Sequence, residues 1–145
     1  MTIKRILALD YGTKRIGLAI GDTENRIASP HGIIENRGLE FVILRILEFC
    51  EDWGIKKIIL GLPLNMDDSS DNEMMTIVRH FLSKLRDKIK REDKDISVEL
   101  FDERLTSFEA KKLISEYPDA YKHPRARKDE ISAQILLSRF FDKQA

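Results

Sequence analysis

Several acidic residues lie at positions, far apart in the sequence, that folding could bring together. Asp10 ends the apolar run over residues 6–9 and is followed by a basic turn that contains a glycine. Asp102 and Glu103 end a later apolar run, and Asp129 shares a helical stripe with small and apolar residues. Converging carboxylates repel one another unless a cation neutralises them. Hard oxygen ligands without paired Cys or His residues predict Mg²⁺ or Mn²⁺ rather than zinc.

Spacing alone leaves two questions about these carboxylates open. Side chains alternate along a strand, so only one of Asp102 and Glu103 can face a shared crevice, and the sequence does not say which. A plainer interpretation also stands beside the metal site. In it, Asp10 and Glu103 are solvated strand ends and Asp129 caps the N-terminus of a helix.

Apolar periodicity supplies the elements that would position these residues. Gly54 is the predicted stop of one helix, and capping boxes at Ser70 and Thr106 open two others. The expected elements begin with strands over 4–10, 15–21 and 27–34, a helix over 39–53 and a strand over 55–60. A helix from about residue 70, which the charged run 88–95 ends, and a strand over 96–101 follow. The last elements are a helix over 106–116, a loop over 117–128 and a helix over 129–141.

This order predicts an α/β fold in a single domain over residues 1–145. The opening strands form an antiparallel meander, and the later strand–helix–strand units require parallel pairing through right-handed crossovers. We therefore expect a mixed five-stranded sheet with helices on both faces. Sites in such sheets form beyond the carboxyl ends of the parallel strands, where Asp10, residues 61–65 and the pair Asp102 and Glu103 would meet.

Composition limits the classes of partner. Lys plus Arg and Asp plus Glu balance at 25 each, so any binding of a polyanion must depend on local charge. Cys50 has no second cysteine to pair with, which fits a buried position and a reducing cytosol. No export signal or membrane-spanning run is visible, so we expect a cytoplasmic protein without a membrane partner. His31, His80 and His123 are too scattered to form a metal site.

Four segments resemble the YqgF/RuvX family of RNase H-like proteins, and they occur in the order of that family. They are LALDYGTKRIGLAIGD from Leu7, GLPLNM from Gly61, FDERLTSFEA from Phe101 and KDEISAQILL from Lys128. The resemblance covers nearly the whole chain. The chain departs from the family pattern at residues 67–71, which lack the usual glycines. It also departs at residues 125–128, which replace a turn that often contains glycine.

The resemblance implies an RNase H-like fold and a metal-dependent nuclease. Its acidic residues would be Asp10, Glu103 and Asp129, which favours Glu103 over Asp102. Members of the family are described as pre-16S rRNA nucleases that act on the 5′ end of the precursor, and also as Holliday junction resolvases. The expected partner is therefore a structured RNA precursor or a four-way DNA junction, and a junction resolvase would be expected to work as a homodimer.

The expected chemistry is hydrolysis of a phosphodiester bond with one or two Mg²⁺ or Mn²⁺ ions held by these carboxylates. Basic residues near the predicted site would contact the substrate backbone, although each also fits plain surface charge. They are Lys14, Arg15, Arg104, Arg125, Arg127 and Lys128. Tyr121 and His123 are candidates for stacking on bases.

Two other function classes compete with a nuclease. The turn after Asp10 also resembles the first phosphate loop of actin-like and hexokinase-like proteins, but that fold needs two lobes and the chain has room for one. A catalytically silent RNA-binding assembly factor is the other. Three converging carboxylates argue against it, because a protein that performs no chemistry has no need to bring them together.

Overall fold

The computed structural model describes residues 3–62, 68–102, 115 and 124–144. Strands and helices follow one another in an order that matches the expected α/β pattern. The elements are β1 (Arg5–Tyr11), β2 (Arg15–Asp22), β3 (Ser29–Glu35), α1 (Leu39–Trp53), β4 (Ile55–Leu62), α2 (Asp68–Arg91), β5 (Ser97–Asp102) and α4 (Pro124–Gln144).

The strands form one mixed sheet in the order β3-β2-β1-β4-β5. β1 pairs antiparallel with β2, and β2 pairs antiparallel with β3, which confirms the predicted meander. β4 lies parallel to β1, and β5 lies parallel to β4. At the edge of the sheet, β3 contains Pro30, which has no N–H to donate and is tolerated there for that reason.

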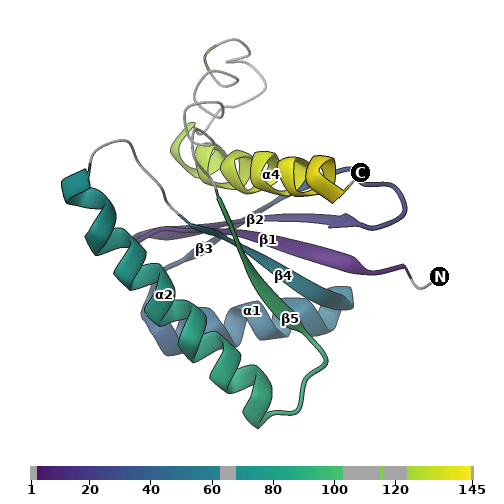
Figure 1. Ribbon diagram of the computed structural model, residues 1–145, viewed down its shortest axis with the longest axis horizontal. Coiled ribbons are helices and arrows are strands. Elements are labelled where there is room, and N and C mark those ends of the chain that lie inside the picture. The colour runs from purple at the N-terminus through teal and green to yellow at the C-terminus, as the bar shows by residue number, and fades with distance from the viewer. Residues whose placement is uncertain (1–2, 63–67, 103–114, 116–123, 145) are drawn as a thin grey trace.

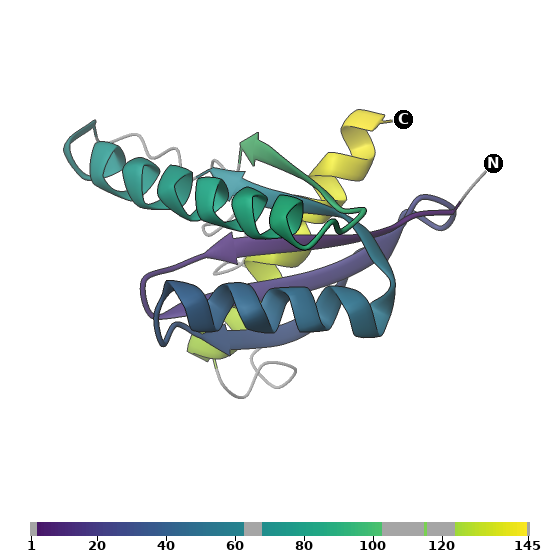
Figure 2. The same ribbon diagram turned by 90° about the horizontal axis from the view of Figure 1, so that it is seen from below.

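Helices cover both faces of the sheet, as expected. α4 lies on one face, and α1 and α2 lie side by side on the other (Figures 1 and 2). Successive residues of β1 alternate between these layers: Ile6 and Ala8 pack with α4, whereas Leu7 and Leu9 belong to the core beneath α1 and α2. Asp10 follows Leu9, so the alternation turns it toward the α4 face.

The boundaries of α1 and α2 agree only in part with the prediction. α1 ends at Gly54 as expected, and this glycine adopts a left-handed conformation with φ 64°. α2 begins at Asp68, two residues before the capping box at Ser70, and ends at Arg91, inside the charged run that was predicted to end it. Asp93, with φ 51°, lies just beyond this end of the helix.

The prediction of a loop up to residue 128 is wrong. α4 begins at Pro124, because proline lacks the N–H that a first helical residue leaves unbonded and has a φ suited to that position. Arg125, Arg127 and Lys128 therefore lie on a helix, and Asp129 lies inside it rather than at its first turn. The predicted helix over 106–116 falls outside the described residues apart from Ser115.

The thiol of Cys50 is buried in the core under α1, which confirms the expectation from sequence. No described helix has both the length and the apolar composition that crossing a bilayer requires.

Candidate active site

Asp10 lies half-buried at the carboxyl end of β1, the central strand of the sheet. Its partner in the antiparallel ladder is Gly17 of β2. Paired residues in such a ladder have Cα atoms about 4.5–5.5 Å apart. Whatever packs on Gly17 therefore lies next to Asp10.

Asp129 packs on Gly17. A Cβ atom placed on Gly17 would overlap the backbone carbonyl of Asp129, so only glycine lets α4 approach β2 this closely. The Asp129 side chain is 15% exposed. The structure thus brings Asp10 and Asp129, which are far apart in the sequence, to one end of one face of the sheet.

Arg15 forms an ion pair with Asp129. Its Nε donates to Oδ2 of Asp129 at 2.6 Å, and the arginine side chain is 31% exposed. Arg15 stands two residues before Gly17 in β2, so both face α4. The sequence predicted that Arg15 contacts the substrate backbone. In the structure its guanidinium forms an ion pair with an acidic residue of the candidate site.

Further contacts attach α4 to the region of β3. The backbone N–H of Gly32 donates to Oε2 of Glu130 at 2.6 Å, and Nε2 of Gln134 donates to the carbonyl of Ala28 at 3.1 Å. Neither Glu130 nor Gln134 was singled out from the sequence. The signal that could have found them is their i, i+4 spacing, which places two polar residues on one side of a helix with an apolar face.

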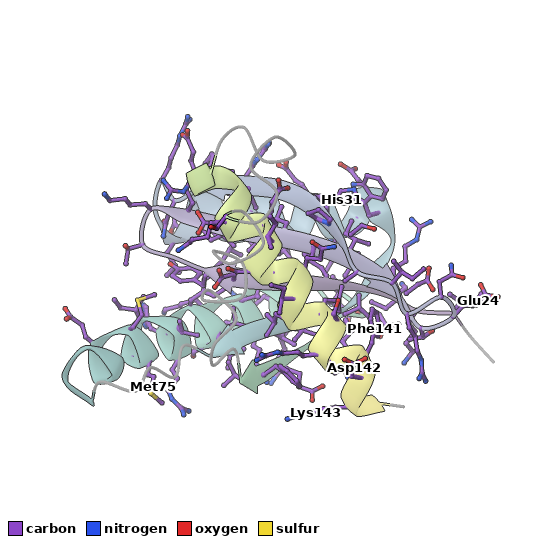
Figure 3. The ribbon with its side chains drawn as sticks, turned by 90° about the horizontal axis from the view of Figure 1, so that it is seen from above. Glu24, His31, Met75, Phe141, Asp142 and Lys143 are labelled. Carbon is purple, nitrogen blue, oxygen red and sulfur yellow. The ribbon has the colours of Figure 1, made fainter. Side chains whose placement is uncertain are left out.

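Figure 3 looks onto the α4 face and shows the helix crossing the strands obliquely, with Phe141 and Lys143 toward its C-terminal end. There the Phe141 ring fills the space above Gly21, which leaves no room for a side chain on that glycine. Phe140 packs edge-on against Phe101 of β5, with ring centroids 5.9 Å apart. Contacts at both ends therefore fix the position of the helix on the sheet.

The turn between β1 and β2 is also held in place. Nδ2 of Asn36 donates to the Gly12 carbonyl at 3.0 Å and lies 3.3 Å from the Tyr11 hydroxyl. The backbone N–H of Asn36 donates to the carbonyl of Lys14 at 2.9 Å. The Lys14 side chain is exposed beside Arg15, where a bound polyanion could reach it.

Other predicted site residues cannot be placed. Glu103 and Arg104 lie outside the described residues, as do Tyr121 and His123, and the side chains of Arg125 and Arg127 are also not described. Lys128 is half-buried on α4. Within the described part of the chain, no three His, Cys, Asp or Glu side chains gather around a point that could hold a metal ion. Of the three predicted carboxylates, the structure describes Asp10 and Asp129.

The order and pairing of the strands, with helices on both faces, are those of an RNase H-like fold. The structure resembles Thermus thermophilus RuvC in complex with a Holliday junction substrate, with a TM-score of 0.61 at 11% identity over 97% of this chain and 95% of that one. It also resembles the yeast mitochondrial Holliday junction resolvase Ydc2, with a TM-score of 0.58 at 12% identity over 97% and 79% of the two chains.

The chain belongs to the family described as "RuvX: Holliday junction resolvase", whose model matches residues 4–143. A relative from Endomicrobium trichonymphae is 36% identical over 144 residues, which cover 99% of each chain. One from Psychrobacter cryohalolentis is 39% identical over 137 residues, which cover 94% of this chain and 78% of the other. Both carry the name "Putative pre-16S rRNA nuclease". Resolvase and nuclease alike denote hydrolysis of phosphodiester bonds in nucleic acids.

Proposed function

We propose that this protein is a metal-dependent endonuclease that processes the 5′ end of pre-16S rRNA, with Asp10, Glu103 and Asp129 as its acidic residues. The observation that carries the proposal is the packing of Asp129 on Gly17, the ladder partner of Asp10. Arg15 compensates one of these two carboxylates, and a divalent ion bound by both would relieve their mutual repulsion. The name shared by relatives that align along nearly the whole chain supports RNA as the substrate.

The choice of Glu103 as the third carboxylate is supported by the face that β5 turns toward α4. Phe101 contacts Phe140 of α4, so alternate residues of β5 point to the α4 face. Glu103 has the parity of Phe101, and Asp102 has the opposite parity. The family resemblance favours the same residue.

The donor chemistry fits Mg²⁺ or Mn²⁺, because the candidate ligands are carboxylate oxygens. A bound ion would supply an activated water and stabilise the leaving oxygen. The protein's contribution is to keep the oxygens fixed: β1 and β2 hold Asp10 through their ladder, and the contacts at Gly17, Gly32 and Ala28 hold Asp129.

Local positive charge would hold the substrate. Lys14 is exposed on the turn beside the site, and Lys128 precedes Asp129 on α4. Contacts of such residues with phosphates position a strand without reading its sequence. Arg104, Arg125 and Arg127 belong to the same proposed set.

A four-way DNA junction is the second candidate substrate. The description of the family and the fold shared with RuvC both favour it. A junction has two equivalent strands to cut, so this function would be expected to need a symmetric dimer.

Parallel cleavage assays test the proposal. The purified protein is incubated with Mn²⁺ or Mg²⁺ and, side by side, with a labelled 5′ precursor end of 16S rRNA and a labelled four-way junction. Cleavage of the RNA alone, lost in Asp10→Asn, is the expected result. Cleavage of the junction alone would replace the substrate, and no cleavage of either would contradict the nuclease assignment.

A further inference from the structure

We propose that Arg15 is the resident counter-ion of the metal-free site and that it sets the affinity of the site for its divalent ion. This inference rests on the proposed nuclease function and deepens it. It assigns to Arg15 a role in regulating metal occupancy in place of a contact with the substrate.

Arg15 and Asp129 form a short ion pair that is mostly shielded from solvent. Nε of Arg15 lies 2.6 Å from Oδ2 of Asp129, slightly shorter than the range of about 2.7–2.9 Å that is typical of a charge-assisted N–H···O bond. The two side chains are only 31% and 15% exposed. The pair between Arg37 and Glu35 on the neighbouring strand offers a contrast, because its side chains are 67% and 66% exposed and largely screened by water.

Arg15 is not needed to hold Asp129 in position. The backbone of Asp129 packs on Gly17, and the next residue, Glu130, accepts the hydrogen bond from Gly32. These contacts fix α4 independently of the guanidinium. What Arg15 adds is positive charge beside a mostly buried carboxylate, at the end of the sheet where Asp10 adds a second negative charge.

The ion pair and metal binding are thermodynamically linked, because both use Asp129. A divalent ion bound by Asp129 would lie close to the guanidinium, so the two cations would repel each other and compete for the same carboxylate. The part of the interaction between Arg15 and Asp129 that is lost when the ion binds would then appear as weaker metal binding, because the coupling between the two cations is reciprocal.

Thermal unfolding and calorimetric titration with Mn²⁺ test this inference without any nuclease assay. In Arg15→Gln, measured in EDTA, we expect Tm to fall by at least about 3 °C. We also expect Mn²⁺ to bind on the order of fivefold more tightly, so that saturating Mn²⁺ narrows the difference in Tm. Arg37→Gln, the matched variant from an exposed pair, is expected to change neither quantity.

Arg15→Lys separates charge from shape. Lysine keeps the positive charge, so its affinity for Mn²⁺ is expected to stay close to that of the wild type, even if the variant is less stable. This variant also keeps the inference testable if Arg15→Gln fails to fold in EDTA. Lysine and glutamine variants that bind Mn²⁺ equally would overturn it.

The remaining outcomes distinguish the inference from the function on which it rests. If the wild type binds Mn²⁺ but Arg15→Gln binds it equally or more weakly, the role of Arg15 is refuted and the nuclease proposal stands. If the wild type neither binds Mn²⁺ nor Mg²⁺ nor gains stability from them, both proposals fail together.

Discussion

Gly17 and Asp129 are in backbone contact across the interface between β2 and α4, and the contact leaves no volume for a side chain at position 17. The closeness of the acidic residues depends on this absence of a Cβ atom. Gly17→Ala should therefore push α4 away from β2. We expect it to lower the free energy of unfolding by about 1–3 kcal/mol and to weaken Mn²⁺ binding, measured by denaturant unfolding and calorimetry.

Gly21→Ala is the matched control for that experiment. A Cβ atom there would lie 2.7 Å from the Phe141 ring, so this variant should also be destabilised. It lies at the other end of β2, however, because Gly21 pairs with Ile6 rather than Asp10. Mn²⁺ affinity should therefore survive in Gly21→Ala. An equal loss in both variants would mean that the effect at Gly17 is not local.

Asp10→Asn should abolish cleavage, because the amide removes a negative charge that the proposed metal site needs. The folded structure should persist, with circular dichroism unchanged. Asp52→Asn, at an exposed position of α1, should keep full activity. Normal cleavage by Asp10→Asn would reject the site.

Glu130→Ala should loosen the attachment of α4 to β3. The substitution removes the carboxylate that accepts from the N–H of Gly32, in a part-buried place. A lost partner of this kind costs about 1–3 kcal/mol, which corresponds to a fall in Tm of a few degrees. Differential scanning calorimetry measures it. Glu130→Gln retains an acceptor oxygen and should lose less; equal losses would show that the hydrogen bond is not the cause.

Cys50 should be unreactive in the folded protein. Burial raises the pKa of its thiol from 9.0 to about 12, so almost no thiolate forms at neutral pH. We expect slow alkylation by iodoacetamide at pH 8 in the native state and rapid alkylation in denaturant, followed by mass spectrometry. Fast native labelling would contradict the burial.

The raised pKa of Cys50 also makes the stability of the folded protein depend on pH in the alkaline range. The folded state keeps the proton of Cys50 up to about pH 12, whereas the unfolded chain releases it near pH 9. The neutral Cys50 thiol therefore makes its full contribution to the free energy of unfolding below about pH 9. This contribution is lost as the pH rises toward 12. Replacing the thiol with a group that does not titrate, as in Cys50→Ala, should remove this part of the alkaline loss.

Local patterns predicted much of the fold. The apolar runs gave the strands, and their order with the helices gave the mixed sheet, because antiparallel turns and parallel crossovers are decided by connection length. Asp10 was found because it ends a buried strand. The start of α4 was missed, because the basic residues after Pro124 resemble a loop until the proline is recognised as a first helical residue.

The partner of Arg15 was beyond prediction from the sequence. Its position after a glycine turn fits surface charge and substrate contact equally well, and the ion pair with Asp129 exists only once α4 has docked on β2. The close approach at Gly17 is likewise a property of tertiary packing. No local pattern in β2 distinguishes that glycine from Gly21, which faces a different part of the same helix.

The division of the site between the two ends of the chain has a consequence for biosynthesis. Asp10 and Arg15 leave the ribosome early, with the first strands, whereas Asp129 emerges among the last residues of this chain. Until α4 arrives, the apolar residues Ile6, Ala8 and Ile59 on its face of the sheet remain uncovered. A growing chain can therefore assemble the meander and still lack a complete set of acidic residues. The proposed acidic site and the burial of that face should therefore form together, when α4 docks on the sheet.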